Sequence, residues 1–376
     1  MPAVNSALVV GGGAAGAATA ILLADAGVAV DLVEIKSQPG AAGSGITLQG
    51  NALRVLGQLG VWDEARAAGY AFDSVGLRAP DPTGTLLAEI PDAPTGGPDF
   101  PATLGMPRPD LARILLDRAA AAGAKLRFST TFTTLEQDAR GLNVTFSDGS
   151  AGRYDLLVGT DGIRSQTRRA LGIELETRSL GMGIWRAFGP RPASVVRTDL
   201  YYGGPCYIAG FCPTGEDSLY AYIVEAAQDR STLTPEEQLA TMRSLAAAYH
   251  GPWDDIRDTL DDPQRVNYTW FETHVLDVPW NRGRAVVIGD AAHCCPPTLA
   301  QGAAQALEDA AVLSELLIDS RALDQSLWDA FHARRYERAR AVVEASNQLC
   351  AWLTAREQGD VPALMRSIAG LVSQPA

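Results

Sequence analysis

The sequence predicts an α/β fold, α+β overall, in which a parallel sheet and a mixed or antiparallel sheet are interleaved along the chain. A short apolar run at residues 7–10 leads into three glycines and a helix of small residues. Alternating patterns typical of antiparallel strands appear between about residues 181 and 271. Two long helical patterns, at residues 303–317 and 327–353, then follow a further buried strand.

The composition bounds the class of protein. With 376 residues and 47% hydrophobic residues, the chain can bury one large core or two unequal ones. A net charge of −13 without a basic run argues against a nucleic-acid partner. The five cysteines fit neither a zinc site nor a disulfide framework, so we expect reduced thiols, no metal and a cytoplasmic location. The N-terminal apolar run lacks a charged leader and contains glycines, so we expect neither a secretory signal nor stable membrane insertion.

Glycines at positions 11, 13 and 16 lie between a predicted strand and helix. Gly11 permits a tight turn, Gly13 lets the backbone approach a pyrophosphate, and Gly16 allows close helix–strand packing. Glu34 ends the next strand, where a carboxylate can accept hydrogen bonds from ribose hydroxyls. The pattern favours dinucleotide binding over a tight turn without chemical meaning, but it does not distinguish FAD from a nicotinamide cofactor. The residues assigned to this site are Gly11, Gly13, Ala14, Ala15, Gly16, Glu34, Ile35 and Lys36.

The middle of the chain predicts further elements. Apolar residues at helical spacing predict one helix over residues 51–68, and a second helix is expected over residues 110–122. Residues 80–101 are rich in Pro, Gly and Asp and predict an excursion away from the first sheet. Two strands are expected around Thr131 and Val144, joined by a turn.

Two later motifs complete a recognisable set. Residues 156–168 read LLVGTDGIRSQTR, and residues 285–310 read AVVIGDAAHCCPPTLAQGAAQALEDA. Together with the N-terminal glycines, they closely resemble the p-hydroxybenzoate-hydroxylase-like (group A) flavoprotein monooxygenases over about residues 4–345. The resemblance implies a Rossmann-like FAD domain of glutathione-reductase type, with non-covalent FAD and with NADH or NADPH as co-substrate.

The resemblance also divides the chain into domains. It implies that residues 1–78, 101–178 and 272–345 form a discontinuous FAD-binding domain. Residues 79–100 and 179–271 would form the substrate domain. Residues 346–376 would form a C-terminal helical segment.

Further cofactor residues follow from the resemblance. Arg108 matches an arginine that contacts FAD, and Asp161 and Gly162 match the middle motif, which lies near both FAD and the nicotinamide coenzyme. Asp290 matches the ligand of the flavin-side ribose, and Pro297 matches a proline beside the isoalloxazine ring.

Gly302 and Ala303 match a helix N-terminus aimed at the flavin pyrimidine. The residues themselves support this, because a helix of small residues starts directly after a Pro-rich loop. The dipole of such a helix can stabilise negative charge on a reduced ring. The alternative is a plain helix start.

Three residues of the last motif invite a chemical reading. We expect a hydrogen-bonded structural role for His293 rather than direct proton transfer, since the chemistry of the group needs no histidine nucleophile. Adjacent cysteines rarely form a relaxed bridge, so Cys294 and Cys295 are expected to line the ring rather than form a redox pair.

The substrate pocket is less legible. Tyr220 and Tyr222 are two apart on a predicted strand, so their side chains share one face. They could stack on an aromatic substrate or hydrogen-bond to it, although ordinary sheet packing is the alternative. Tyr201, Tyr202 and Arg186 are further candidates for the pocket.

The resemblance implies that reduced FAD reacts with O₂ to a C4a-hydroperoxide, which hydroxylates a small activated aromatic or heteroaromatic substrate. A tyrosine relay or a positive Arg186 could assist ionisation of a substrate hydroxyl. Three alternatives stay open. One is a related flavoprotein that performs epoxidation, Baeyer–Villiger oxidation or antibiotic modification. The others are a flavin dehydrogenase or reductase, and a non-catalytic FAD-binding sensor. A homodimer is also compatible with the sequence.

Overall fold

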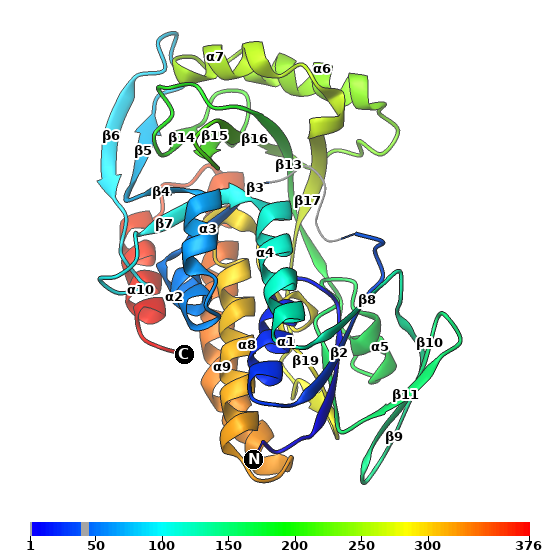
Figure 1. Cartoon of the computed structure of the whole chain (residues 1–376). Helices are drawn as coiled ribbons and strands as arrows, with labels where there is room; N and C mark the ends of the chain where they lie inside the picture. Colours follow the sequence, from blue (N-terminus) through cyan, green and yellow to red (C-terminus); the bar gives the residue numbers. More distant parts are fainter. Residues whose placement is uncertain (1, 39–44) are drawn as a thin grey trace.

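The glycine-rich turn stands at the centre of a six-stranded sheet. The computed structural model describes residues 2–38 and 45–376, and Figure 1 shows this sheet in the lower half of the molecule. Its strand order is β18-β19-β12-β1-β2-β8, and all neighbours pair in parallel except β18 and β19. The strands are β1 (Ser6–Val10), β2 (Ala29–Glu34), β8 (Lys125–Phe128), β12 (Leu156–Gly159), β18 (Asn281–Arg282) and β19 (Ala285–Val287).

Both faces of this sheet are covered, which explains the uninterrupted apolar run of β1. Ala7 and Val9 belong to a core cluster with the small and apolar residues of α1 (Ala14–Asp25), α4 (Arg108–Ala121) and α8 (Gly302–Asp319). Leu8 and Val10 belong instead to a cluster with a three-stranded meander. The meander strands are β9 (Phe132–Asp138), β10 (Gly141–Phe146) and β11 (Ala151–Tyr154).

The second large sheet has eight strands in the order β20-β17-β13-β16-β15-β14-β5-β6 and is mostly antiparallel. One face packs against α6 (Pro235–Ala246) and α7 (Pro252–Thr259), which lie across the top of Figure 1. The strands are β5 (Ser74–Arg78), β6 (Leu86–Pro91), β13 (Arg178–Pro190), β14 (Thr198–Tyr202), β15 (Ile208–Pro213), β16 (Ser218–Ala226), β17 (Val266–Val275) and β20 (His293–Cys294).

The domain boundaries remain a prediction, and two elements bear on them. β5 is a strand of the eight-stranded sheet, although the boundary at residue 78 assigned it to the other domain. α9 (Gln325–Ala355) runs without a break across residue 346 and packs against α8 and α10 (Val361–Ser373). Among the helices of the described chain, none is long and apolar enough to cross a membrane.

The prediction of one helix over residues 51–68 is wrong. The structure has α2 (Gly50–Gln58) and α3 (Trp62–Ala68), separated by a turn. Gly60 in this turn has a φ of 71°, in the left-handed region that interrupts a helix. A small sheet of β3 (Gly45–Gln49), β7 (Thr103–Pro107) and β4 (Tyr70–Phe72) lies beside these helices, and Figure 1 shows it between the two large sheets.

Leu8→Ala should lower the free energy of unfolding by about 2–5 kcal/mol, because Leu8 is fully buried in the central strand and its loss leaves a cavity. Leu87→Ala is the matched control, since Leu87 is 67% exposed and should change stability by less than about 0.5 kcal/mol. Urea unfolding of both variants measures the difference. Equal effects would contradict the placement of β1 in the core.

Candidate functional site

The first turn of the site is built by glycines. Gly11 has a φ of 109°, and a Cβ atom there would lie 2.6 Å from the carbonyl oxygen of Thr160. A Cβ atom at Gly16 would overlap the carbonyl oxygen of Gly11. At Gly13, by contrast, a Cβ atom would meet nothing within 4 Å. Gly11 and Gly16 therefore permit close packing, while the backbone at Gly13 is open to a ligand.

Glu34 holds this turn from the end of β2. One carboxylate oxygen accepts a hydrogen bond from the backbone N–H of Gly12 at 2.8 Å, and the other accepts from that of Lys36 at 2.9 Å. Each oxygen retains a lone pair for a further donor. The arrangement suits a ribose hydroxyl next to Glu34, while the side chain of Ile35 is 68% exposed.

Asp161 of the middle motif is occupied by its own loop. Its carboxylate accepts hydrogen bonds from the Ser165 hydroxyl at 2.5 Å and from the backbone and hydroxyl of Thr167 at 2.8 and 3.0 Å. These contacts organise the start of α5 (Gln166–Ala170), whose Arg168 donates to the carbonyl of Ala291 at 2.8 Å. The middle motif thereby braces the loop of the last motif, beside Asp290.

The backbone carbonyl of Asp290 accepts a hydrogen bond, whereas its side chain accepts none from the described residues. The His274 Nε2–H donates to the Asp290 carbonyl at 2.9 Å, and burial lowers the pKa of His274 to about 4, so this histidine is neutral. The Asp290 carboxylate is exposed and accepts no hydrogen bond from any residue that the structure describes. Partial loss of hydration raises the pKa of Asp290, against the opposing charges of His293 and Arg108. An unpartnered carboxylate of this kind fits a ligand that offers hydroxyl donors, such as a ribose.

The last motif ends in an open helix terminus. A 3-10 turn at Pro297–Leu299 and a left-handed Ala300, with a φ of 51°, lead into α8 at Gly302. A Cβ atom at Gly302 would meet only the Cys295 sulfur, at 3.8 Å. No side-chain hydrogen bond caps the start of α8, and the space beside Gly302 is open, which suits the flat edge of a flavin.

The neighbouring thiols are protonated. Burial raises the pKa of Cys295 to about 12 and raises the pKa of Cys294 further. The Cys294 thiol donates a weak hydrogen bond to the carbonyl of Glu272 at 3.7 Å. Neither thiol forms a disulfide, and their states agree with the prediction that they line the site.

His293 points into the core. Its Nε2 lies 2.6 Å from a carboxylate oxygen of Asp309, which is fully buried and also accepts from Arg335 at 2.7 Å. Burial alone would raise the pKa of Asp309, but His293 and Arg335 lower it to about 2. This setting supports the structural role predicted for His293. Sequence reasoning missed both partners, although a Glu-Asp pair inside an apolar helix pattern was a signal for buried ion pairs.

Tyr220 and Tyr222 lie side by side on the face of the eight-stranded sheet that turns away from α6 and α7. Their ring centroids are 5.1 Å apart, with the ring planes inclined by 31°. Tyr220 packs on Gly45, where a Cβ atom would overlap the ring. Burial raises the pKa of Tyr220 to about 12 and raises the pKa of Tyr222 well above its usual value, so both hydroxyls are donors at neutral pH.

Tyr201 does not belong to this face, and the prediction that it lines the pocket is wrong. It is fully buried against Tyr249 and Phe211 on the α6–α7 side, and its hydroxyl donates to the carbonyl of His250 at 2.7 Å. Successive residues of a strand point to opposite faces. Tyr202 accordingly points away from that core and is 45% exposed.

Arg186 and Arg108 connect this face to the cofactor region. Arg186 pairs with Tyr222 in the strand register, and its guanidinium donates to the Thr269 hydroxyl at 2.6 Å. Arg108, the first residue of α4, is close enough to act electrostatically on Arg186, Tyr220 and Asp290. Four of the predicted site residues therefore lie within electrostatic reach of one another or of Arg108, between the two large sheets: Asp290, Arg108, Tyr220 and Arg186.

A family model described as an FAD binding domain matches residues 5–346. The chain belongs to this family of FAD-dependent monooxygenases. It is 31% identical to a 2-heptyl-3-hydroxy-4(1H)-quinolone synthase of Pseudomonas aeruginosa, over 82% of this chain and 80% of that protein. It is 28% identical to a 6-hydroxynicotinate 3-monooxygenase of Bordetella bronchiseptica, over 94% and 93% of the two chains.

The fold is shared with solved members of the family. The structure of Klebsiella pneumoniae HpxO complexed with FAD and uric acid superposes with a TM-score of 0.84, at 22% identity, over 98% of this chain and 97% of the other. The matching FAD-binding family model shows that FAD is the cofactor of the family, and NAD(P)H is its usual co-substrate. The individual FAD contacts remain predictions, which the open backbone at Gly13 and Gly302 and the free Asp290 carboxylate support.

Asp290→Asn should weaken FAD binding about tenfold to hundredfold, because a charge-assisted hydrogen bond contributes roughly 1.5–3 kcal/mol. Titration of the apoprotein with FAD, followed by flavin fluorescence, measures the affinity. The pKa of folded Asp290 is raised, so its ionisation destabilises the fold as the pH rises. The variant apoprotein should therefore be at least as stable as wild type at pH 7. Unchanged FAD affinity would remove Asp290 from the cofactor site.

Proposed function

We propose that this monooxygenase uses NAD(P)H and O₂ to hydroxylate a small aromatic or heteroaromatic substrate that binds as an anion beside Arg186. The observation that supports this proposal most strongly is the environment of Arg186. Its only hydrogen-bond partner in the part of the chain that the structure describes is the neutral Thr269 hydroxyl, at 2.6 Å. No carboxylate pairs with it there. Loss of hydration lowers the pKa of Arg186, and the nearby charge of Arg108 adds to the effect.

A partly desolvated cation without a counter-ion is unfavourable, and a bound anion relieves that cost. A substrate carboxylate or phenolate would form charge-assisted hydrogen bonds with the planar guanidinium. A free phenol ionises near pH 10, and an adjacent positive charge lowers the pKa of such a group. Arg186 therefore provides a means of keeping a hydroxylated ring in its electron-rich form.

The two tyrosines supply the rest of the recognition that we propose. Their rings offer a flat surface on which an aromatic substrate can stack, and Tyr220 carries its hydroxyl within the electrostatic reach of Arg186. Because both hydroxyls stay protonated, they donate to a substrate oxygen rather than remove its proton. Pro297 is proposed to pack beside the flavin on the opposite side.

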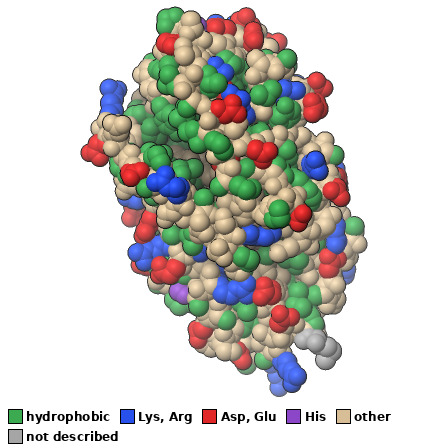
Figure 2. Space-filling model, turned by 90° about the vertical axis from the view of Figure 1, so that its left-hand side faces the viewer, with side chains coloured by type: hydrophobic (Ala, Val, Ile, Leu, Met, Phe, Trp, Pro, Cys, Tyr) green, Lys and Arg blue, Asp and Glu red, His purple; other side chains and the backbone are tan. Residues whose placement is uncertain are grey.

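FAD, when bound, supplies the oxygen-activating chemistry, and the chain orients the reactants and excludes water. The open N-terminus of α8 at Gly302 is placed to stabilise negative charge on the cofactor. Figure 2 shows a hollow bordered mainly by hydrophobic side chains in the upper half of the side of the molecule that faces the viewer. We propose this hollow as the substrate entrance.

The nicotinamide coenzyme has a candidate place beside the middle motif. A cavity of about 690 Å³ there is lined by three arginines and three glutamates, namely Arg164, Arg168, Arg169, Glu174, Glu176 and Glu272, among other residues. Guanidinium groups suit the phosphates of a coenzyme that binds without its own Rossmann domain. A homodimer and a cytoplasmic location remain predictions.

The names of the relatives support a heteroaromatic substrate. Hydroxynicotinate, a heptylquinolone and uric acid are all nitrogen heterocycles, and each can carry an ionisable oxygen. We therefore place hydroxylated N-heteroaromatics first among the candidates.

Arg186→Met should raise the KM for an anionic substrate on the order of tenfold to hundredfold and lower the coupling of NAD(P)H oxidation to product, because one charge-assisted contact is lost. Arg178→Met on the same strand is the matched control, since Arg178 is exposed. Steady-state kinetics on a panel of phenols and hydroxypyridines measure both. A KM that is equally altered in the two variants would contradict the role of Arg186.

Turnover under ¹⁸O₂ with mass spectrometry of the product tests the reaction itself. We expect one labelled ring hydroxyl, ortho or para to the activating hydroxyl or amino group. Label in an ester or epoxide would assign the chain to a different monooxygenation. Coenzyme oxidation without label in any product would refute the proposed hydroxylation.

A further inference from the structure

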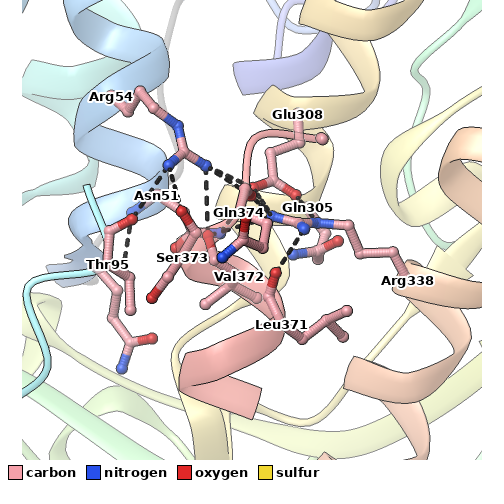
Figure 3. Close-up of polar contacts among 12 residues, drawn as sticks. Asn51, Arg54, Thr95, Gln305, Glu308, Arg338, Leu371, Val372, Ser373 and Gln374 are labelled. Atoms are coloured by element: carbon pink, nitrogen blue, oxygen red, sulfur yellow. Dashed lines mark hydrogen bonds and ion pairs between the residues drawn. The ribbon is translucent and has the colours of Figure 1, made fainter. Parts of the chain in front are cut away.

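A buried cluster of charges joins three helices behind the loop that leads into α8 at Gly302. It consists of Glu308 and Asp309 of α8, Arg335 and Arg338 of α9, and Arg54 of α2, and we call it the Glu308 cluster. Glu308 is 1% exposed and Arg335 is fully buried. Figure 3 shows most of the cluster, together with the carboxyl end of α10.

Glu308 is the hub of the cluster. One carboxylate oxygen accepts from Asn51 Nδ2 at 3.1 Å and Arg338 Nη2 at 2.7 Å, and lies 3.6 Å from Arg54 Nη2. The other accepts from Arg335 Nη1 at 3.1 Å and Arg338 Nε at 2.8 Å. A carboxylate that accepts this many hydrogen bonds fixes each donor in place.

The end of α10 completes the charge balance. Three guanidinium groups face two carboxylates, so the five side chains together carry one excess positive charge. Arg338 donates to the carbonyls of residues 371, 372 and 374 at 2.7, 3.2 and 2.9 Å. Arg54 donates to those of residues 372, 373 and 374 at 3.2–3.3 Å. Helix C-terminal carbonyls carry partial negative charge, so α10 supplies what the carboxylates do not.

Two buried side-chain amides, those of Asn51 and Gln301, connect the Glu308 cluster to the residue before α8. Asn51 Nδ2 donates to Gln301 Oε1 at 3.0 Å, and Gln301 Nε2 donates back to Asn51 Oδ1 at 3.1 Å. Both side chains are fully buried, and Gln305 also donates to Gln301 at 3.2 Å. Gln301 directly precedes Gly302, where α8 begins.

We propose that the end of α10, acting through Arg54, Arg338, Glu308 and Asn51, fixes Gln301 and thereby aligns the N-terminus of α8 with FAD. Glu308 and Asn51 are thus positioning residues for the cofactor. The backbone N–H groups of the first turn act on a ligand only in one orientation, and a small displacement weakens that interaction. The packing of α10 would in this way affect the binding and the midpoint potential of the flavin.

Glu308→Gln tests the proposal, with Glu315→Gln as the matched control. Glu315 lies on the same helix, but its carboxylate pairs with Arg334 at the surface and is 54% exposed. We expect Glu308→Gln to weaken FAD binding to the apoprotein on the order of tenfold, because it removes a charge that anchors Asn51 and the arginines. We also expect the midpoint potential of the bound flavin to fall, since the helix terminus would stabilise reduced flavin less well. Glu315→Gln should change neither quantity.

Arg54→Lys provides a second variant if Glu308→Gln fails to fold. It keeps the charge at a partly exposed position but cannot bridge three carbonyls with a planar fork. It should shift affinity and potential in the same direction, by a smaller factor. Wild-type affinity and potential in a folded variant would overturn the proposal. So would a fall in thermal stability of the apoprotein without a change in potential, which would show that the cluster only supports the fold. FAD titration needs no substrate, so failure here would leave the proposed hydroxylation untouched.

Discussion

The parallel pairing of β12 with both β1 and β19 is the constraint on which the rest of the site depends. Three motifs that are far apart in the sequence follow these strands, and parallel strands present their carboxyl ends at the same edge. Gly11, Thr160 and Gly289 therefore meet at one edge of the sheet. The close contact between Gly11 and Thr160 excludes any side chain there, which explains why a glycine is needed. The helices, the second sheet and the cofactor loop are all placed relative to that edge.

Two groups of charged side chains differ in whether their charges are paired. In the core, Glu308 and Asp309 are surrounded by donors, and their charges are compensated by buried arginines. Between the two sheets, Asp290 and Arg186 have no ionic partner among the described residues. Loss of hydration raises the pKa of Asp290 and lowers the pKa of Arg186, and both shifts favour the neutral form of the side chain. A charge that has lost hydration and has no ionic partner is unfavourable, and it is found where a ligand can supply the missing partner.

α8 links these two groups. Its first turn faces the predicted flavin site, and its second turn carries the carboxylates of the core cluster. The ion pairs of the second turn anchor the helix whose first turn is proposed to act on the flavin. A helix start held by packing alone would move more easily, since apolar contacts do not specify direction.

Local patterns in the sequence determined much of this protein. The glycine spacing, the acid at the end of β2 and the two later motifs identified the cofactor family. The period of two along β16 placed Tyr220 and Tyr222 on one face. The tertiary structure alone decided that Tyr201 lies in the opposite core, that the helix over residues 51–68 breaks at a glycine turn, and that Asp161 is occupied by its own loop. It also decided that Arg186 has no acidic partner among the residues that the structure describes, and that residues 371–374 are connected to Gln301 through Arg338, Glu308 and Asn51. The reason is physical: spacing along a chain specifies which face a side chain takes, whereas its charge partner depends on which distant elements pack against that face.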